Sequence, residues 1–397
     1  MKAVVIGAGR IGCGLAGQLF RSSGLDVTFI TRNPETAANL NRNGKYHVLA
    51  TSANAQQKIT VDGIRAIHAS DTGLAIAAIA EADVIATAVR VENLPAVAPL
   101  IAAGLSGKKT RSNVIAFENM EHVGACLRGL VASAMAHPEE IEKHGFSGAV
   151  ISRIVTRRIG NPGDDAPVTF VGDMVEEFIV DRTTLREPLP LIAGMKAVDN
   201  YHAFVLRKLY TFSAGHATAA YLGWLKGYHY IHTAIRDREI RRAVLAAMEE
   251  GQRGLAARFG KEFAGGPAEL QAIVARFENA AINDPIDRVA RDPHRKLGAS
   301  ERLVGAARMA EAAGIIPEQL ALATAAALCF CGVGQHGNNC QVRAECAEVT
   351  AALNQICGLD AAHGFGRSVA CSWELLAPSL LPGNLLLSLN SRMWARI

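Results

Sequence analysis

The chain has 397 residues, of which half are hydrophobic and a fifth are charged, and its formal net charge is +4 at pH 7. This length allows two ordinary domains, the small dispersed charge speaks against nucleic-acid binding, and no apolar run approaches the roughly 20 residues that a membrane span requires. Met1 and Lys2 lead straight into an apolar run, so we expect a cytoplasmic protein without a signal peptide, whose partners are neither nucleic acid nor membrane.

The first predicted element is a strand over residues 2–6, which leads into a G-x-G-x-x-G turn at 7–12 and then into a helical pattern. This order is the fingerprint of a dinucleotide-binding unit, in which the glycines permit a tight turn, close approach to the pyrophosphate and close helix packing. The helix N-terminus then offers free N–H groups to the phosphates. A tight turn that binds nothing is the alternative. The residues assigned to the cofactor are Gly7, Gly9, Arg10, Ile11 and Gly12.

The second predicted strand, residues 26–30, ends at Thr31 and Arg32. In the fingerprint an acidic residue at this place holds the ribose 2′-hydroxyl of NAD, whereas an arginine accommodates the 2′-phosphate of NADP. Arg32 could pair with that phosphate and Thr31 could hydrogen-bond to it. We therefore expect NAD or NADP as the cofactor, with NADP at least tolerated. An arginine in a solvated loop is the alternative.

Further apolar runs alternate with helical patterns, as they do in a parallel sheet. From residue 196 onward, apolar spacings of three and four predict helices and no strand. We therefore predict an α/β protein with a Rossmann-type parallel-sheet domain over residues 1–195. An all-helical substrate-binding and catalytic domain follows over residues 196–397. The further strands predicted in the first domain cover residues 82–88, 112–117, 149–155 and 167–171.

The helical half contains a run of mostly apolar or small residues, 207–223, that includes Lys208, Ser213 and His216. At about 100° per residue, Ser213 lies roughly 140° and His216 roughly 80° around a helix from Lys208, so all three fit one side. A lysine on such a helix either points into solvent or is desolvated, and desolvation lowers its pKa. Hydride transfer from an alcohol needs such a base, together with donors for the developing alkoxide.

Asn119 follows the predicted strand over 112–117, at the carboxyl end where ligands of a parallel sheet bind. Its amide both donates and accepts hydrogen bonds. It can therefore hold a substrate oxygen or the nicotinamide ribose. An asparagine that only forms a turn is the alternative.

Late cysteines raise the question of a metal site. Cys329, Cys331, His336 and Cys340 could be drawn as a ligand set, but C-x-C does not match the usual spacing of zinc ligands. We expect no metal here. The region is instead predicted to be a helix followed by a glycine-rich loop with incidental thiols.

Several motifs occur in the same order as in one known group of enzymes. They are GAGRIGCG (7–14), FEN (117–119), VISRIV (150–155), EEFIVD (176–181), VDNYHAFVLRKLYTFSAGHATAAYLGWLKGY (198–228), DPIDRVARDPHRKLGASERL (284–303) and NQICGLD (354–360). Together they cover nearly the whole chain and resemble the polyol-specific long-chain dehydrogenases, the mannitol dehydrogenase family. The branch that acts on mannitol 1-phosphate is the nearer match.

The resemblance implies a metal-independent oxidoreductase that interconverts a sugar-alcohol phosphate and a ketose phosphate, such as mannitol 1-phosphate and fructose 6-phosphate. It implies Lys208 as the general base, Asn119 as the group that polarises the reacting oxygen, and His216 as a substrate-binding histidine. Each assignment has a purely structural alternative: Lys208 could be a surface lysine, His216 a core histidine, and the basic residues named next a solvated face. The resemblance assigns three basic residues to the substrate: Arg288, Arg295 and Lys296. Arg295 is the one expected to bind the phosphate.

Ser213 departs from the family, which has asparagine at this position. Serine keeps a hydroxyl donor but is shorter and loses the second hydrogen bond of an amide. The substrate preference or the rate could therefore differ from those of the family. A non-phosphorylated polyol, or a hexonate of the altronate or mannonate type, is the alternative substrate, since Arg295 and Lys296 could serve a carboxylate as well as a phosphate. A nucleotide-binding protein without catalysis is the alternative from another functional class.

Overall fold

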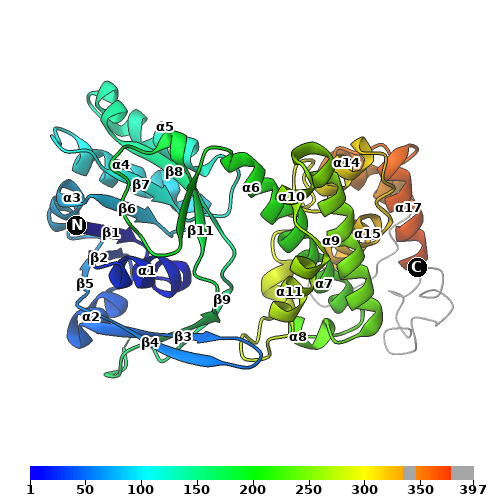
Figure 1. Cartoon of the computed structure of the whole chain (residues 1–397), viewed down its shortest axis with the longest axis horizontal. Coiled ribbons are helices and arrows are strands. Elements are labelled where there is room, and N and C mark those ends of the chain that lie inside the picture. The colour runs from blue at the N-terminus through cyan, green and yellow to red at the C-terminus, as the bar shows by residue number, and fades with distance from the viewer. Residues whose placement is uncertain (162, 334–345, 377–397) are drawn as a thin grey trace. The chain divides into compact units, whose positions relative to one another are not determined.

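The computed structural model describes residues 1–161, 163–333 and 346–376. The chain divides into two compact units, Met1–Val205 and Leu206–Ile397 (Figure 1). The first unit is built around a largely parallel sheet and the second is helical, so the predicted fold class is confirmed. Among the described residues, none of the helices is both long enough and apolar enough to cross a membrane.

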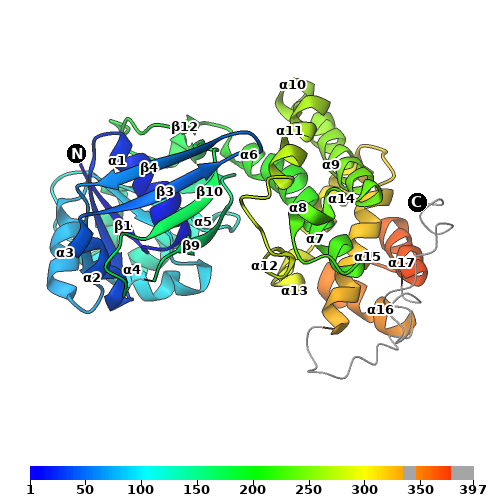
Figure 2. The same cartoon turned by 90° about the horizontal axis from the view of Figure 1, so that it is seen from below.

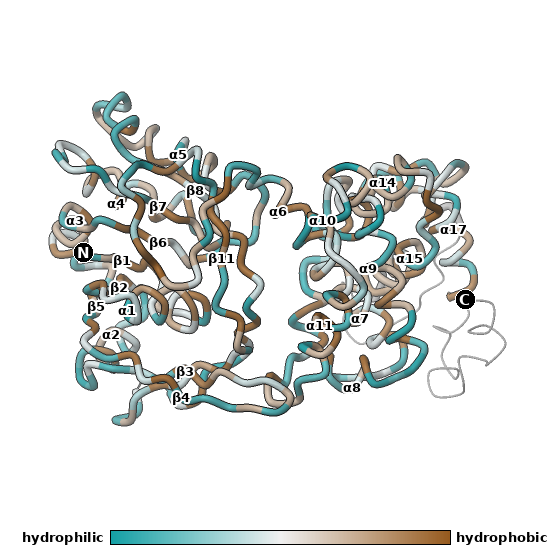
Figure 3. Tube along the Cα trace, in the orientation of Figure 1, coloured by the Kyte–Doolittle hydropathy of each residue, from teal (hydrophilic) through white to brown (hydrophobic). Residues whose placement is uncertain are grey.

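The central sheet of the first unit has eight strands in the order β12-β11-β8-β7-β6-β1-β2-β5. Neighbouring strands are parallel except for β8 and β11. The central strands β6 and β7 are buried at every position, because both faces of the sheet are covered, and Figure 3 shows their hydrophobic character. The strands are β1 (Lys2–Ile6), β2 (Asp26–Thr31), β5 (Arg65–His68), β6 (Val84–Thr87), β7 (Asn113–Ala116), β8 (Gly145–Ile151), β11 (Phe178–Asp181) and β12 (Met195–Val198).

Two hydrophobic cores lie on opposite faces of this sheet. Ile79, Ile101 and Leu127 of the helices α3, α4 and α5 join one core. The other core includes residues that follow β1 and residues of a second sheet, and there the hydroxyl of the buried Tyr46 donates to the Cys13 carbonyl at 2.8 Å. The principal helices of this unit are η1 (Gly12–Gly17), α1 (Gln18–Ser22), α2 (Pro34–Asn43), α3 (Thr72–Glu81), α4 (Leu94–Leu105) and α5 (Val123–Ala134), with short 3-10 helices η2 (Val91–Asn93), η3 (Pro138–Lys143) and η4 (Arg182–Thr184) between them and after them.

The second sheet has four strands in the order β4-β3-β10-β9, with β3 and β10 parallel (Figure 2). The prediction of one strand over residues 149–155 is wrong, because these residues divide between the two sheets. The chain leaves the central sheet after Ile151, and Ile154 N–H donates to the Asp173 carboxylate at 3.3 Å before Val155 begins β9. The strands are β3 (Lys45–Thr51), β4 (Gln56–Asp62), β9 (Val155–Ile159) and β10 (Thr169–Asp173).

The second unit is a set of helices around the buried helix α7 and the long amphipathic helix α9. Helix α9 begins at an Asp237 N-cap, whose side chain accepts from the Glu239 and Ile240 N–H groups. The principal helices are α7 (Ala214–Leu225), α8 (Ile231–Ala234), α9 (Arg238–Phe259), α10 (Lys261–Ala264), α11 (Pro267–Phe277), α12 (Ile286–Ala290), α13 (Pro293–Lys296), α14 (Val304–Ala312), α15 (Glu318–Val333), α16 (Cys346–Ala352) and α17 (Gly364–Leu376).

The prediction of helix from residue 196 onward is wrong at its start. Residues 196–198 belong to strand β12, which pairs in parallel with β11 through Phe178 and Met195. An edge strand of four residues is too short to show a period-two pattern. Helix α6 (Tyr201–Lys208) then begins in the first unit and ends in the second.

Candidate active site

The turn after β1 has the geometry that the glycine fingerprint predicts. Gly7 has φ +108°, and a Cβ on it would lie 2.5 Å from the Ala88 carbonyl oxygen. A Cβ on Gly12 would lie 1.7 Å from the Gly7 carbonyl oxygen, so only glycine lets the helix approach the strand. A Cβ on Gly9 would meet no atom within 4 Å. The space over Gly9 is therefore open to a ligand.

A cavity of about 640 Å³ lies beside this turn. Gly7, Gly9, Thr31 and Arg32, all assigned to the cofactor from the sequence, line it. Arg10 instead donates from Nη1 to the Thr156 carbonyl at 2.8 Å, which joins the turn to β9. The remaining described lining residues are Ile6, Ala8, Ile30, Asn33, Thr36, Ala69, Thr72, Ile76, Val89, Asn93, Ala96, Val97, Pro99, Leu100, Ala103 and Arg158.

Glu118, two residues after β7, holds the segment that carries Asn119. Its buried carboxylate accepts from the Thr87 hydroxyl at 2.7 Å and from the Val89 N–H at 2.8 Å. Burial raises the pKa of Glu118, and both hydrogen bonds oppose this shift. Asn119 is thus attached to a fixed point next to Val89, which lines the cavity. Glu118 is a supporting residue that the sequence did not single out.

Lys208 is the last residue of α6 and has a half-buried side chain. Burial, reinforced by the positive charges of Arg302 and Arg295 and opposed by Glu301, lowers the pKa of Lys208 to about 7. A lysine with this pKa is partly neutral at physiological pH and can accept a proton.

The run between Lys208 and His216 is not a regular α-helix. Residues Leu209–Ser213 form a π-helical segment (η5) between α6 and α7. The angles expected from ideal α-helical geometry therefore do not hold across it, because a π turn contains an additional residue. Ser213 is buried at the end of this segment.

His216, on α7, belongs to a buried network that joins residues far apart in the sequence. Its Nε2 lies 3.1 Å from an Asp284 carboxylate oxygen. Its ring stacks on Phe277, with 4.8 Å between the ring centroids and 13° between the planes. Arg288 donates to both oxygens of Asp284, each at 2.6 Å. The positive charge of Arg288 therefore balances the negative charge of the ionised Asp284.

The charges of this network fix the state of the imidazole. Burial alone would raise the pKa of Asp284, but hydrogen bonds from His216 and Arg288 lower it to about 2. Burial lowers the pKa of His216, against the effect of Asp284. An ionised carboxylate beside a neutral ring requires the proton on Nε2. The Nδ1 lone pair of His216 is then an acceptor.

The other two basic residues assigned to the substrate differ in exposure. Lys296 is buried, and its ammonium donates to the Val289 and Arg291 carbonyls. Burial and the charge of Arg302 lower the pKa of Lys296 to about 7. Arg295 is exposed and donates to Glu301 at 3.0 Å. Arg295 is therefore the more accessible cation.

Of the four late residues considered as metal ligands in the sequence, His336 and Cys340 lie outside the described residues. Burial raises the pKa of Cys329 to about 12 and that of Cys331 to about 11, so both are thiols.

A different cluster in the first unit, Glu121, His122 and His202, brings three ligand atoms within 4.8 Å of one another. Its two imidazole rings are stacked, with 6° between their planes. The in-plane lone pairs of parallel rings do not converge on one ion.

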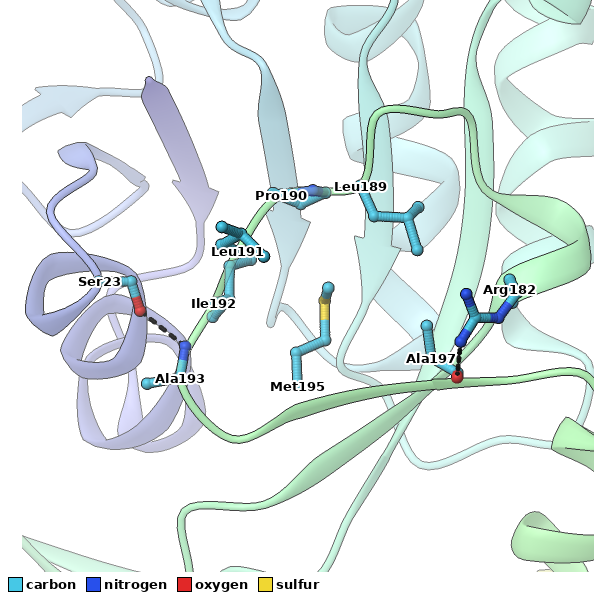
Figure 4. Close-up of a pocket in the computed structure, with 9 residues that line it drawn as sticks. All are labelled: Ser23, Arg182, Leu189, Pro190, Leu191, Ile192, Ala193, Met195 and Ala197. Carbon is cyan, nitrogen blue, oxygen red and sulfur yellow. Dashed lines mark hydrogen bonds between the residues drawn. The ribbon is translucent and has the colours of Figure 1, made fainter.

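A further cavity, of about 490 Å³, lies where the chain connects β11 to β12 (Figure 4). Ala193 N–H donates to the Ser23 hydroxyl at 2.8 Å there, and Arg182 donates to the Ala197 carbonyl at 2.8 Å. Leu191, one of the lining residues, is 91% exposed. None of the residues assigned to catalysis, cofactor or substrate is among its described lining residues.

Comparison with known proteins identifies related domains in the same order along the chain. Residues 1–193 match the family model of the mannitol dehydrogenase Rossmann domain, and residues 200–362 match that of the mannitol dehydrogenase C-terminal domain.

Two solved structures have a similar fold. The Pseudomonas fluorescens mannitol 2-dehydrogenase, in a ternary complex with NAD and D-mannitol, has a TM-score of 0.77 at 16% identity, over 100% of this chain and 94% of that one. A D-sorbitol dehydrogenase in substrate-free form has a TM-score of 0.73 at 14% identity, over 96% of this chain and 94% of that one.

Proposed function

The chain belongs to the mannitol dehydrogenase family, and we propose that it is a metal-independent, NAD(P)-dependent oxidoreductase that interconverts a sugar-alcohol phosphate and a ketose phosphate. The mannitol 1-phosphate and fructose 6-phosphate pair is the substrate type that we favour. The family agrees with the resemblance seen in the sequence motifs. The proposed reaction rests on the place of Lys208, half-buried at the end of α6, where burial and the charges of Arg302 and Arg295 lower its pKa to about 7.

The first unit supplies residues suited to a nicotinamide dinucleotide. The open space over Gly9 leaves room for a pyrophosphate, and Thr31 and Arg32 line the cavity beyond it. When bound, the nicotinamide ring accepts or returns the hydride. Asn119, fixed through Glu118, donates to the reacting oxygen.

Lys208 takes the hydroxyl proton during oxidation and returns it during reduction. A base with a pKa near the working pH is present in both protonation states, so it serves both directions. The positive charge of Arg302 helps to keep Lys208 from being permanently protonated. Ser213 supplies a second, shorter donor to the developing alkoxide.

His216 acts as a neutral acceptor for a substrate hydroxyl, through Nδ1. Asp284 holds the proton on Nε2, and Arg288 holds Asp284 ionised. Asp284 and Arg288 are thus positioning residues in this proposal. This changes the role of Arg288 from the direct substrate contact that the resemblance implies.

An anionic substrate suits the charge around Lys208. Besides burial, Arg302 and Arg295 lower the pKa of Lys208 and also that of Lys296. Glu301 accepts hydrogen bonds from both arginines and only partly balances their charge. The exposed Arg295 is suited to bidentate contact with a phosphate. A carboxylate would be attracted by the same charge, so a hexonate dehydrogenase is the second candidate. A non-phosphorylated polyol would not use it.

The test is a panel of mannitol 1-phosphate, mannitol and mannonate, assayed with NAD and with NADP. We expect turnover with the phosphate ester to exceed that with the other two. Turnover of mannonate alone would support the hexonate assignment. Dinucleotide binding without turnover of any of them would indicate a binding protein.

Removal of Lys208 tests the mechanism. Lys208→Ala is expected to lower kcat by roughly 10²- to 10⁴-fold, the usual contribution of a general acid or base, while dinucleotide affinity stays near that of the wild type. Lys261→Ala removes an exposed lysine of the same unit and serves as the matched control. Full activity of Lys208→Ala would contradict the mechanism.

A further inference from the structure

Arg90, three residues after β6, has a backbone conformation that residues with a side chain rarely adopt. Its φ is +74° and its ψ is +150°, in a region populated essentially by glycine. The other described non-glycine residues with positive φ are His122, Asn283 and Asp292. His122 and Asp292 have ψ values of 24° and 52°, in the left-handed helical region that histidine and aspartate tolerate. Arg90 lies outside that region, so its backbone is strained.

Hydrogen bonds on both sides of Arg90 impose this conformation. The Val89 N–H donates to the Glu118 carboxylate at 2.8 Å, and the Val89 carbonyl accepts from the Asn93 side chain at 2.7 Å. The Arg90 carbonyl accepts from the Asn93 N–H at 3.0 Å. Strain of this kind persists only where the surrounding structure fixes it. Glycine would make the same backbone bonds without strain, so what arginine adds at this position is its side chain.

Arg90 lies at the same edge of the sheet as Asn119, at the end of the neighbouring strand. Strands β6 and β7 are parallel, and their last pair is Thr87 with Ala116. Arg90 and Asn119 each follow that pair by three residues, and the Glu118 carboxylate joins the two strand ends by accepting from the Thr87 hydroxyl at 2.7 Å. Neighbouring strands are about 4.8 Å apart. Arg90 is thus beside the residue that we assign to the reacting oxygen.

The Arg90 side chain lies next to the cofactor cavity and outside it. Val89 and Asn93 line that cavity, whereas Arg90 is absent from its described lining. The Arg90 Nε lies 3.2 Å from a carboxylate oxygen of Glu92, and the two side chains are 69% and 61% exposed. Such a solvated ion pair is weak, so an anion with better geometry can replace Glu92. The absence of Arg90 from the cavity lining favours the substrate over the dinucleotide as that anion.

We propose that Arg90 binds the phosphate of the substrate, as a specificity-determining residue contributed by the first unit. This inference rests on the proposed function and deepens it. A guanidinium presents paired N–H donors that match two oxygens of a phosphate. A polyol phosphate whose reacting oxygen is held by Asn119 carries its phosphate at the other end of a short carbon chain, where a long side chain from the adjacent strand end can meet it. Glycine at position 90 would relieve the strain but could not make this contact.

Arg90→Gly separates this role from a structural one, because it should change stability and substrate affinity in opposite directions. Release of the strain should raise Tm by roughly 2–6 °C. Loss of the guanidinium should raise KM for mannitol 1-phosphate by about tenfold, while KM for mannitol and the dissociation constant of the dinucleotide stay within about twofold. A higher Tm with an unchanged KM for mannitol 1-phosphate would overturn the proposal, and so would an equal rise in KM for both polyols.

Three further variants serve as controls. Arg90→Ala removes the guanidinium but keeps a Cβ in the strained conformation, so it should raise KM as Arg90→Gly does without raising Tm. Arg90→Lys keeps the charge and loses the paired donors, so its KM should be intermediate. Arg42→Ala is the matched control, because Arg42 is an exposed arginine of the same unit, paired with Asp165 at 2.8 Å and absent from the described lining of the cavity. Its KM should equal that of the wild type.

The outcomes distinguish this inference from the proposed function. A wild type that turns over no polyol phosphate would reject both. A wild type active on mannitol 1-phosphate, whose KM is unchanged in Arg90→Gly and Arg90→Ala, would reject the inference alone. Weaker dinucleotide binding by Arg90→Gly, with an unchanged KM for mannitol 1-phosphate at saturating cofactor, would make Arg90 a cofactor contact and overturn the inference.

Discussion

The two units build their candidate sites in different ways. In the first unit the backbone shapes the site. The turn at 7–12 leaves space for a ligand at Gly9 and is tightly packed at Gly12. In the second unit the site is a network of side chains, in which His216 depends on Asp284, 68 residues further along the chain. A backbone site is set by a few glycines close together in the sequence. A side-chain network is set by distant partners, so single changes in it have graded effects.

The largest effect short of removing Lys208 is expected from the backbone site. Gly12→Ala places a Cβ 1.7 Å from the Gly7 carbonyl oxygen, so the turn must move, and with it the N–H groups at the start of the helix that face a pyrophosphate. We expect dinucleotide affinity, measured by calorimetry, to fall by roughly 10- to 100-fold, as for lost charge-assisted hydrogen bonds. Gly129→Ala, where a Cβ meets no atom within 4 Å, should bind normally. Normal binding by Gly12→Ala would show that the turn is not what fixes the cofactor.

A graded effect is expected from the His216 network. Asp284→Ala removes the partner that holds the proton on Nε2, and we expect kcat/KM for the polyol phosphate to fall by about 10- to 100-fold. Nitrogen-15 NMR of labelled histidine should show Nε2 protonated and Nδ1 unprotonated in the wild type, and a mixture of tautomers in the variant. A purely structural role would lower stability without changing the tautomer.

Asp284→Asn sharpens this experiment. Its amide oxygen still accepts from Nε2, so the tautomer should persist, but the charge that pairs with Arg288 is lost. We expect kcat/KM between that of the wild type and that of Asp284→Ala. A wild-type His216 protonated on Nδ1 would contradict the proposed acceptor role.

The smallest effect is expected at the exposed Arg295. Arg295→Ala should raise KM for a phosphate ester by about tenfold and leave KM for a non-phosphorylated polyol within about twofold, because a solvated cation contributes modestly. Arg291→Ala, an exposed arginine paired with Asp292 at 3.6 Å, is the control. An equal change in KM for both substrates would place Arg295 outside any phosphate site.

The difference between a local backbone site and a network of distant side chains also explains which features could be predicted from the sequence. The fingerprint glycines, Lys208 and the order of a sheet unit before a helical unit are local patterns, and each could be interpreted from residues close together. Asp284 and Glu118 were not singled out, because their partners His216, Thr87 and Val89 come from other elements. The second sheet was partly missed because strands such as β4, which is mostly exposed, show no apolar run. The π-helical segment that ends at Ser213 leaves no signal in the hydrophobic spacing.

The proposed role of Lys208 as the general base has a direct consequence for the pH dependence of polyol oxidation. With a pKa of about 7, Lys208 is neutral above that pH and protonated below it. Oxidation kcat/KM should therefore be level above pH 7 and fall about tenfold per pH unit below it. Ketose reduction, which needs the protonated form, should fall above pH 7.

Lys296 also has a pKa of about 7, so the decisive measurement is the oxidation profile of Lys208→Ala rescued by added methylamine. We predict that turnover returns in proportion to the neutral amine and that the inflection moves from about pH 7 to the pKa of methylamine itself. No rescue, or an inflection that stays near pH 7, would contradict the assignment of Lys208.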